Sequence, residues 1–572
     1  LFVSDRGGQR GAWLLDLERE GAEPIAAPEI DGAVSEAVFS PDGRFIAAIA
    51  TPDAQRRVVA ARGWRSITRL RYRADGVGYL DDFPVLWLID LEASTARPLT
   101  DGTGAIANPA WSPDGRTVAF VGEHRPEADS LYHTELWLAD IGGIAPVKIA
   151  SLAGAVEAPS WSTDGSTIAF VGHDDGAAYS LAPLRLHTVR RDGSALACLT
   201  PGVAWTAANA LIGDLDAAPG ALPPRAASDG SWLVMGTSAG TCGVYRVGTD
   251  RRADRLTPTD CSIADFSVAN GELAATASDS ASPPEIYACA ETGERWRRLT
   301  FETQTWALPR RFERARKFVV EAGDHRVDAW HLRGSGDAPR PCVLEVHGGP
   351  HFSYGETFMF EFQMLAQAGY DVVFANPRGS QGYGEAFARA IVGDWAQPAF
   401  DDCIAALDRA LAGGEIESRR MGVAGGSYGG YLTLWILAHD RRFGAGVAMR
   451  CASNLESLWG TSEVGRMLDV ELGTTPAADP ELYRRCSPLP LADRITAPLL
   501  LLHAENDFRC PIEQAEQVFT ALKRRGATVE FIRYSGADHG LTRGGPPKLR
   551  VAHWRATLGW FDRYIGTNRP AF

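Results

Sequence analysis

Short runs of alternating apolar and polar residues recur through the first half of the chain, and most of them flank an Asp-Gly step. The run around Asp42-Gly43 returns around Asp114-Gly115 and Asp164-Gly165, and a weaker copy surrounds Asp229-Gly230. Alternation with a period of two indicates strands with one buried face, and Asp-Gly between two such runs favours a hairpin. The pattern therefore predicts a series of antiparallel hairpins.

A second apolar signature lies between the hairpins, at residues 86–90, 136–140 and 286–289. Together the two signatures give a unit of about 40–50 residues with four strands, which is typical of a β-propeller blade. Five fairly complete units end near residues 100, 150, 200, 257 and 300, and residues 1–6 match the strand that follows such a hairpin. We therefore expect a β-propeller of six or seven blades over residues 1–308, with an incomplete first blade.

Residues 61–82 interrupt this repeat and show none of its signatures. The segment carries an Arg-rich run with Arg69, Arg71 and Arg73. Such a run is either a solvated loop or a surface that faces another part of the molecule, and the sequence leaves both interpretations open.

The pattern changes after residue 308, where buried-type strands begin to alternate with helical stretches. Alternation of this kind predicts a parallel α/β sheet, so we expect an α/β domain over residues 309–572. The expected strands are residues 342–347, 370–375, 421–424, 498–503 and 529–534, and the expected helices are residues 401–412, 428–438, 512–524 and 551–564.

Charge and composition narrow the class of protein. The net charge is −14, which argues against sequence-independent nucleic-acid binding because that requires a basic surface, so no nucleic-acid partner is expected. No apolar run reaches the ~18 residues that span a bilayer, so no membrane partner is expected.

The cysteines are odd in number and form no Cys-x-x-Cys pair, which favours free thiols in a reducing compartment and a cytoplasmic protein. No cluster of metal ligands and no phosphate-binding loop occurs, so neither a metal nor a cofactor is predicted.

The sharpest chemical signal is the motif Gly425-Gly426-Ser427-Tyr428-Gly429-Gly430, which lies between a predicted strand and a predicted helix. Gly-x-Ser-x-Gly in this context is typical of a nucleophile elbow, where glycines allow a tight turn that exposes the serine hydroxyl. Ser427 is therefore the predicted nucleophile.

A serine hydroxyl needs a base, and the base needs a carboxylate that orients it. In α/β-hydrolases the acid and then the His follow the nucleophile along the chain. Asp507 comes just after one predicted strand and His539 just after the next, at the sheet edge where the elbow lies. Glu505 and Asp538 are rival acids, but we predict Asp507 as the acid and His539 as the base.

The oxyanion of an acyl-transfer reaction needs two hydrogen-bond donors. The N–H group of Tyr428, next to the nucleophile, is the first predicted donor, and its ring is expected to wall the acyl pocket. The sequence His347-Gly348-Gly349-Pro350 ends a predicted strand, and the N–H group of Gly349 is the second predicted donor. We expect His347 to order this loop rather than to transfer protons.

Together these residues resemble the prolyl oligopeptidase family of serine peptidases. Besides the motifs above, the resemblance rests on residues 376–384, 393–395 and 506–511. Within the family, residues 509–517 and 66–82 make the chain most similar to the acylaminoacyl peptidase branch. The resemblance implies hydrolysis of short peptides through an acyl-enzyme, with a propeller that restricts entry to short or terminal segments.

The resemblance leaves open which peptide end is recognised. Dipeptidyl peptidases of this family hold a free amino terminus with two adjacent Glu residues, and this sequence contains no Glu-Glu pair. We therefore expect an acylaminoacyl peptidase-type exopeptidase that releases N-blocked residues. Arg509 is either an ion pair that holds the acid loop or a fork that binds a substrate carbonyl or carboxylate. A carboxylate would make the protein a carboxypeptidase-type exopeptidase, and an oligopeptidase or carboxylesterase would share the triad.

The walls of the acyl pocket are harder to assign. Leu455, Trp459 and Met467 follow the predicted strand at residues 444–449, where this fold often places pocket walls. They suggest an apolar preference at the residue before the scissile bond, and a core role for each is an equal alternative. A homo-oligomer is compatible with the sequence, and either an exposed propeller edge or residues 351–354 could mediate it.

Overall fold

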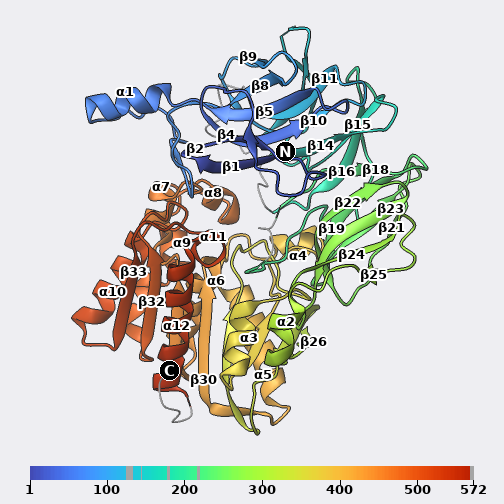
Figure 1. Cartoon of the computed structure of the whole chain (residues 1–572). Helices are drawn as coiled ribbons and strands as arrows, with labels where there is room; N and C mark the ends of the chain where they lie inside the picture. Colours follow the sequence, from blue (N-terminus) through green and yellow to red (C-terminus); the bar gives the residue numbers. More distant parts are fainter. Residues whose placement is uncertain (124–132, 144, 177–180, 216–219, 567–572) are drawn as a thin grey trace.

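The computed structural model describes residues 1–123, 133–143, 145–176, 181–215 and 220–566. The first half of the chain forms six small antiparallel sheets that follow one another in chain order (Figure 1). The first sheet has three strands and each of the next five has four. The strands are β1 (Phe2–Gly7), β2 (Gln9–Leu14), β3 (Ile25–Ala26), β4 (Ala33–Phe39), β5 (Phe45–Thr51), β8 (Val85–Asp90), β9 (Thr95–Pro98), β10 (Ala105–Trp111), β11 (Thr117–Glu123), β12 (Glu135–Asp140), β13 (Val147–Ser151), β14 (Val156–Trp161), β15 (Thr167–Gly172), β16 (Arg185–Arg190), β17 (Ala197–Cys198), β18 (Arg225–Ala226), β19 (Trp232–Ser238), β20 (Thr241–Val247), β21 (Ala253–Arg255), β22 (Ser262–Ala269), β23 (Glu272–Ser278), β24 (Glu285–Ala290) and β25 (Arg297–Arg298).

Each predicted Asp-Gly step joins the first two strands of a sheet, which confirms the hairpins. The Ser that precedes the step explains why the turn forms. The Ser40 hydroxyl donates to Asp42 Oδ1 at 2.6 Å and accepts the N–H of Phe45 at 2.9 Å. The same pair of contacts recurs at Ser112 and Ser162, so one local motif closes three hairpins.

Successive sheets pack face to face through their first strands, β4 on β10, β10 on β14 and β14 on β18. The Trp that ends the first strand of a unit links it to the sheet before. Trp111 Nε1 donates to the carbonyl of Val38 at 3.1 Å, and Trp161 Nε1 donates to that of Ala110 at 3.0 Å. Strand β15 is apolar on both faces because alternate residues enter the cores shared with the preceding and following sheets. This stacking is typical of neighbouring propeller blades.

The segment that interrupts the repeat lies between β5 and β8 and has its own elements. Helix α1 (Ala54–Arg62) has no buried side chain and projects from the body of the molecule (Figure 1). A two-stranded hairpin follows, formed by β6 (Arg73–Ala74) and β7 (Gly78–Tyr79). Its contacts with the second half of the chain are described below.

The second half is built on one eight-stranded sheet with the order β26-β27-β29-β28-β30-β31-β32-β33. The sheet is parallel from β29 through β33, and β26 and β27 add an antiparallel edge that the sequence pattern did not indicate. The strands are β26 (Arg316–Ala322), β27 (His325–Leu332), β28 (Arg340–Val346), β29 (Asp371–Ala375), β30 (Ile416–Gly426), β31 (Phe443–Met449), β32 (Leu499–Ala504) and β33 (Val529–Tyr534). The small sheets end at Arg298 and the large sheet begins at Arg316, with α2 (Gln304–Ala307) and a 3-10 helix (Leu308–Arg310) between them.

Helices cover both faces of this sheet. Side chains of α5, α6 and α10 share one core with the sheet, and side chains of α3 and α12 share the core on the opposite face. The alternation and the predicted α/β class are thereby confirmed. The helices are α3 (Phe360–Gln367), α4 (Glu385–Arg389), α5 (Gln397–Leu411), α6 (Tyr428–His439), α7 (Leu455–Thr461), α8 (Met467–Glu471), α9 (Pro480–Arg485), α10 (Glu513–Arg524), α11 (Leu541–Gly544) and α12 (Pro547–Tyr564), with a 3-10 helix at Leu489–Arg494.

A loop of the first half is hydrogen-bonded into the second half. The N–H of Ile212 donates to the carbonyl of Ser353 at 2.9 Å, in a short parallel bridge. The carboxylate of Asp214 accepts the N–H groups of Phe360 and Glu361 at 2.8 and 2.9 Å and so caps the start of α3. Residues 212–214 therefore form a fixed wall over the large sheet.

Two expectations from composition can be compared with the structure. All nine cysteines are free, and seven of them are buried. Within the described ranges, no helix combines the length and apolar character that crossing a bilayer requires.

Candidate active site

Ser427 forms the turn between the end of β30 at Gly426 and the start of α6 at Tyr428. Its φ of 63° and ψ of −122° lie outside the regions that non-glycine residues usually adopt. Helix α6 is buried along almost its whole length, so the scaffold around the turn is rigid. This is the strand–turn–helix context that the motif predicted.

The glycines of the motif are required because backbones approach closely on both sides of Ser427. A Cβ on Gly425 would lie 2.6 Å from the carbonyl oxygen of Val346, and one on Gly429 would lie 2.0 Å from the same oxygen. Neither contact is one that real Cβ atoms make, and the obstacle is backbone rather than a side chain that could move. The glycines therefore allow α6 to start directly against β28.

Replacing Gly429 by alanine is expected to lower the free energy of unfolding by about 3 kcal/mol, because the new methyl group overpacks a rigid turn. Urea denaturation followed by circular dichroism measures this change. Gly559→Ala is the matched control, because Gly559 is exposed in α12 with nothing within 4 Å of its Cβ position. The control should be neutral or stabilise by up to about 1 kcal/mol. Equal effects of the two substitutions would contradict the steric argument.

His539 and Asp507 meet at the carboxyl edge of the sheet, after β33 and β32 respectively. His539 Nδ1 lies 2.7 Å from Asp507 Oδ2. The other oxygen, Asp507 Oδ1, accepts the N–H groups of Arg509 and Cys510 at 3.0 and 2.8 Å. The carboxylate is thus buried and fixed by two backbone donors, which leaves Oδ2 to orient the imidazole.

The two rival acids have other partners. Glu505 is paired with Arg533 at 3.1 Å. Asp538 Oδ1 accepts the N–H of Gly540 at 2.8 Å, in a local turn. Of the three candidate acids, Asp507 is the one that contacts the His539 ring.

The electrostatic environment leaves His539 neutral and Asp507 ionised at neutral pH. Burial lowers the pKa of His539 to about 4, and the Asp507 carboxylate opposes that shift. Burial acts to raise the pKa of Asp507, but the charges and hydrogen bonds of His539 and His503 outweigh it and hold the pKa well below its usual range. A neutral imidazole held by an ionised carboxylate is the state in which a His accepts a proton.

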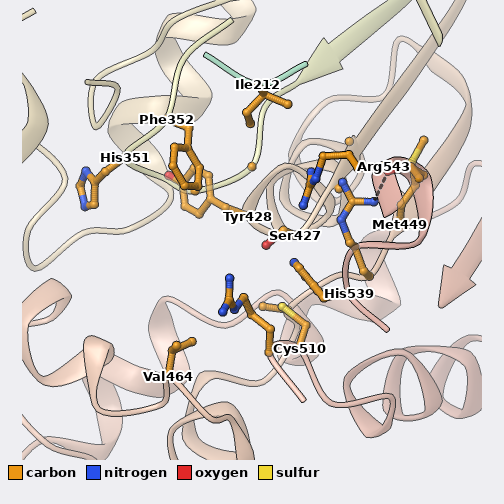
Figure 2. A pocket seen from close by; sticks show the side chains of 18 of the residues that line it. Ile212, His351, Phe352, Ser427, Tyr428, Met449, Val464, Cys510, His539 and Arg543 are labelled. Carbon is orange, nitrogen blue, oxygen red and sulfur yellow. Dashed lines mark hydrogen bonds between the residues drawn. The ribbon is translucent and has the colours of Figure 1, made fainter. Parts of the chain in front are cut away.

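Ser427, Tyr428, His539 and Gly349 line one cavity of about 260 Å³ (Figure 2). Tyr428 is the first residue of α6, so its N–H has no partner within the helix. Gly349 has a φ of 132°, which only glycine adopts readily, and its loop runs against the Ser427 turn. The structure thus brings both predicted donor residues to the cavity that holds the nucleophile.

His347 has the ordering position expected from the sequence. It is buried, with Nε2 2.9 Å from Ser380 Oγ and Nδ1 2.8 Å from the carbonyl oxygen of Gly348. It is not among the residues that line the cavity. Both ring nitrogens are therefore engaged in holding the glycine loop.

Comparisons with known proteins agree with this geometry. The model of the prolyl oligopeptidase family matches residues 356–568. The uncharacterised peptidase YuxL of Bacillus subtilis is 36% identical over 587 residues, covering 99% of this chain and 88% of that protein. The chain belongs to the prolyl oligopeptidase family. It is therefore a serine peptidase, a hydrolase.

Other similarities are more distant. The acylamino-acid-releasing enzyme of Arabidopsis thaliana is 28% identical over 233 residues, which cover 39% of this chain and 30% of that protein. The solved structure of uncomplexed acylaminoacyl peptidase from Pyrococcus horikoshii superposes with a TM-score of 0.84 at 22% identity, covering 99% of this chain and 87% of that one. This structural match shows a shared fold, and in that fold small antiparallel sheets precede an α/β-hydrolase domain.

Arg509 lines the cavity, as its place after Asp507 suggested. Its Nε and Nη2 donate to Glu463 Oε1 at 2.9 and 2.7 Å, so the guanidinium is engaged in an ion pair. Glu463 is buried whereas the Arg509 side chain is half exposed. The arrangement corresponds to the ion-pair interpretation of Arg509, which holds the acid loop in this peptidase.

The predicted acyl-pocket walls are only partly brought together. Met467 lines the cavity, but Leu455 is fully buried in the core of the large sheet and Trp459 is 38% exposed, with Nε1 donating to Asp469 at 2.7 Å. The expectation is corrected for these two because successive positions of α7 point to different faces. Helix α7 presents Leu458 to the cavity instead, and the other apolar lining residues include Met449, Val464 and Leu468.

Besides Arg509 and the predicted triad, the site has charged residues that sequence reasoning missed. The cavity lining includes the acids Asp214, Glu345 and Glu361. Arg450, just after β31, and Arg543, four residues after the base, both line the cavity. Asp75 contacts the backbone of His539, which lies 464 positions further along the chain. Proximity to the His539 motif could have indicated Arg543, whereas no local pattern marks Asp75.

Proposed function

We propose that this family member hydrolyses short peptides through an acyl-enzyme formed on Ser427. The contact of 2.7 Å between His539 and Asp507, beside a strained Ser427 in the same cavity, is the observation that supports this most strongly. Ser427 Oγ attacks the scissile carbonyl while His539 takes the hydroxyl proton and returns it to the leaving amine. Asp507 keeps Nδ1 protonated and stabilises the imidazolium, and the N–H groups of Tyr428 and Gly349 stabilise the oxyanion.

The same proposal gives the first half a gating role. We infer that the six small sheets over residues 1–308 are blades of a β-propeller that covers a catalytic domain at residues 309–572 and limits entry to short peptides. The face-to-face stacking of successive sheets and the wall at residues 212–214 support this arrangement. The free cysteines fit a reducing compartment, so the proposal places the protein in the cytoplasm.

The first candidate activity is release of N-blocked residues, as in an acylaminoacyl peptidase. A free amino terminus would need ionised carboxylates in the cavity. Burial raises the pKa of Glu361 to about 7 and raises that of Glu345 well above its usual range. Asp214, the remaining acid of the lining, already accepts two N–H groups of α3. A blocked, uncharged amino terminus therefore suits this cavity better than an ammonium group.

The second candidate is recognition of the substrate carboxylate, and Arg543 favours it. In the described part of the chain, the Arg543 guanidinium has no hydrogen-bond or ion-pair partner. Arg543 lines the cavity (Figure 2). Arg450 also lines this cavity. Burial and the charges of Arg450 and Arg509 lower the pKa of Arg543 to about 10. Two guanidinium groups facing one cavity attract an anion. The carboxylate clamp, one of the two interpretations that the sequence left open for Arg509, therefore fits Arg543 better.

One peptide in four forms separates these candidates: free, N-acetylated, C-amidated and doubly blocked. Release of the acetylated first residue, unaffected by amidation, would establish the acylaminoacyl peptidase activity. Trimming from the carboxyl end that is lost on amidation would establish the carboxypeptidase activity. Cleavage of all four forms, or faster turnover of nitrophenyl esters than of peptides, would indicate an oligopeptidase or a carboxylesterase.

The carboxylate candidate also predicts the effect of Arg543→Gln. This substitution should raise KM for a peptide with a free carboxyl end by about 10- to 100-fold, since a charge-assisted pair is lost. KM for the amidated peptide should stay unchanged, which mass spectrometry of the products can measure. Arg555→Gln, at an exposed position of α12, is the matched control and should leave both values unchanged. Equal effects of Arg543→Gln on both peptides would exclude the carboxylate role.

A further inference from the structure

The hairpin formed by β6 and β7 reaches from the first half of the chain to the loops that carry the predicted acid and base. Arg73 donates to the carbonyl of Thr461 and lies over the ring of Phe508, whose centroid is 4.7 Å away. A Cβ on Gly76 at the hairpin tip would lie 3.4 Å from Asp538 Oδ2. The Arg-rich segment that interrupts the repeat therefore faces the catalytic loops rather than solvent alone.

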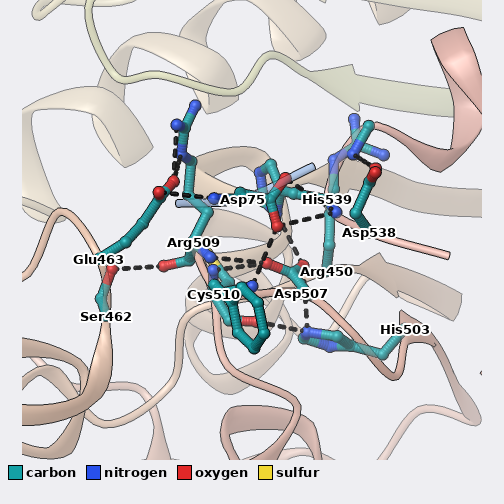
Figure 3. Close-up of polar contacts among 12 residues, drawn as sticks. Asp75, Arg450, Ser462, Glu463, His503, Asp507, Arg509, Cys510, Asp538 and His539 are labelled. Carbon is teal, nitrogen blue, oxygen red and sulfur yellow. Dashed lines mark hydrogen bonds and ion pairs between the residues drawn. The ribbon is translucent and has the colours of Figure 1, made fainter. Parts of the chain in front are cut away.

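The carboxylate of Asp75 connects these two loops (Figure 3). Its Oδ1 accepts the N–H of Phe508, the residue after Asp507, at 3.0 Å. The same carboxylate accepts the N–H of His539 at 3.3 Å through Oδ1 and 3.2 Å through Oδ2. One side chain from the first half thus holds the backbone of the base and the backbone next to the acid.

The backbone of Asp75 makes a second connection. Its N–H donates to Glu463 Oε2 at 2.6 Å, and the other oxygen of Glu463 accepts the Arg509 guanidinium (Figure 3). Glu463 also donates its own N–H to the carbonyl of Phe508 at 2.9 Å. The hairpin tip, the segment after α7 and the acid loop form one hydrogen-bonded unit.

Burying the ionised carboxylate of Asp75 between these loops costs free energy, which its hydrogen bonds to the two N–H groups partly offset. Burial raises the pKa of Asp75 to about 6, the nearby charges of Asp507 and Asp538 raise it further, and the two backbone donors oppose this shift. An ionised acceptor forms shorter and stronger hydrogen bonds to N–H groups than a neutral one. The ionised form therefore holds the two loops most firmly.

We propose that Asp75 is a positioning residue that keeps the Asp507 and His539 loops in register and so aligns the imidazole with Ser427. This inference rests on the proposed function, in which Ser427, Asp507 and His539 form the catalytic triad. Through Asp75 the first half of the chain acts on the chemical step as well as on access. Small displacements of reacting groups have large kinetic effects, so loss of this anchor lowers kcat more than it raises KM.

The proposal has a pH signature. Protonation of Asp75 weakens both anchors, so kcat/KM of the unaltered protein is expected to fall as the pH is lowered through about 6. Protonation of His539 sets a separate, lower limit near pH 4. The charged and titratable groups that face Asp75 from the surrounding elements are Arg73, Glu463, Asp507, Arg509, Asp538 and His539.

Two substitutions of Asp75 test the proposal on the full-length protein. Asp75→Ala should lower kcat by about 100-fold with KM changed by less than about 3-fold. Asp75→Asn keeps one neutral acceptor, so it should lower kcat by only about 10-fold and should lose the pH limb near 6. The readouts are steady-state kinetics over pH 4–9, the rate of labelling of Ser427 by a fluorophosphonate, and thermal unfolding. Should Asp75→Ala fail to fold, the pH profile of Asp75→Asn decides.

The matched control is Asp82→Asn in the same segment. Asp82 accepts the N–H groups of Gln55 and Arg56 at the start of α1 and therefore anchors backbone away from the catalytic loops. The kcat, the pH profile and the labelling rate of the Asp82→Asn variant should equal those of the unaltered protein. Unchanged kcat and an unchanged pH limb in both Asp75 variants would overturn the proposal.

Failure of the proposed function can be distinguished from failure of the positioning role of Asp75. An unaltered protein that neither cleaves peptides nor reacts with the fluorophosphonate would refute the role of Ser427 before any Asp75 variant is made. A reactive unaltered protein whose labelling rate is insensitive to Asp75 would refute the positioning role alone.

Discussion

Replacing Ser427 by alanine is expected to lower peptidase turnover by about 10⁴- to 10⁶-fold, because the acyl-enzyme can no longer form. Binding of substrate should persist, since the cavity walls and the two predicted oxyanion donors stay in place. Turnover of a short peptide, measured together with the KM or the dissociation constant, separates the two effects. The residual rate reports what the N–H groups of Tyr428 and Gly349 contribute without a nucleophile.

Two controls sharpen this prediction. Ser335→Ala removes an exposed hydroxyl that donates to the carbonyl of Gln367, and it should leave activity unchanged. Cys510→Ala removes the thiol that lines the same cavity, whose pKa burial raises well above its usual range. A thiol kept protonated is a poor nucleophile, so this variant should keep most of its activity. Peptidase activity that survives Ser427→Ala and disappears in Cys510→Ala would reverse the assignment.

The second large effect is expected for Asp507→Asn, which should lower kcat by about 10⁴-fold. The substitution is close to isosteric, but the amide can present an N–H to His539 Nδ1 and so favour the wrong tautomer. The backbone donors of Arg509 and Cys510 hold the side chain from the other side, which limits relaxation. Steady-state kinetics at neutral pH, with circular dichroism to verify folding, measure the loss.

Glu505→Gln and Asp538→Asn are the matched controls for this prediction. Both are carboxylates within two positions of a predicted catalytic residue, yet Glu505 pairs with Arg533 and Asp538 with the N–H of Gly540. Each substitution should change kcat by less than about 10-fold, as expected for groups outside the triad. A loss of 10⁴-fold in either one, with Asp507→Asn active, would show that the acid had been misassigned.

The elements that the sequence predicted well are those specified by neighbouring residues. The hairpin at Asp42-Gly43 is closed by Ser40 and Phe45, all within one short segment, so a local pattern suffices. The buried run of β32 and the helix α6 are likewise visible as apolar stretches. The antiparallel pair of β26 and β27 was missed for two reasons. The edge strand β26 has mixed composition and few buried residues, and β27 pairs with β29, which lies beyond β28 in the sequence.

The catalytic geometry was predictable for a different reason. Parallel strands place their carboxyl ends at one edge, so the residues that follow β30, β32 and β33 must converge. That rule gave Ser427, Asp507 and His539 without any contact information, and the structure brings all three to one region. It gave nothing for Leu455 and Trp459, whose direction depends on the rotation of a short helix.

Contacts between distant segments remained beyond sequence reasoning. The first half of the chain supplies both Asp75 and the wall at residues 212–214. The sequence sets residues 66–82 apart, but nothing distinguishes Asp75 within that segment, and no pattern marks residues 212–214. Arg543 lies close to His539 in the sequence, but that its guanidinium has no partner among the described residues is a property of the folded cavity. Single polar side chains that reach the site from distant parts of the sequence could be identified only from the three-dimensional structure.

The connectivity of the molecule also determines the order in which it can mature during synthesis. Apart from the pairing of β5 with β8 across the inserted segment, each small sheet pairs strands that are neighbours in sequence, so it can fold soon after its residues leave the ribosome. Residues 212–214 can form their hydrogen bonds only after Ser353 and α3 have been synthesised. The Asp75 carboxylate likewise can bind the N–H of His539 only after that loop has been synthesised. A nascent chain can therefore carry finished sheets before the predicted triad can form, so hydrolytic activity can begin only after the loop of His539 has been synthesised.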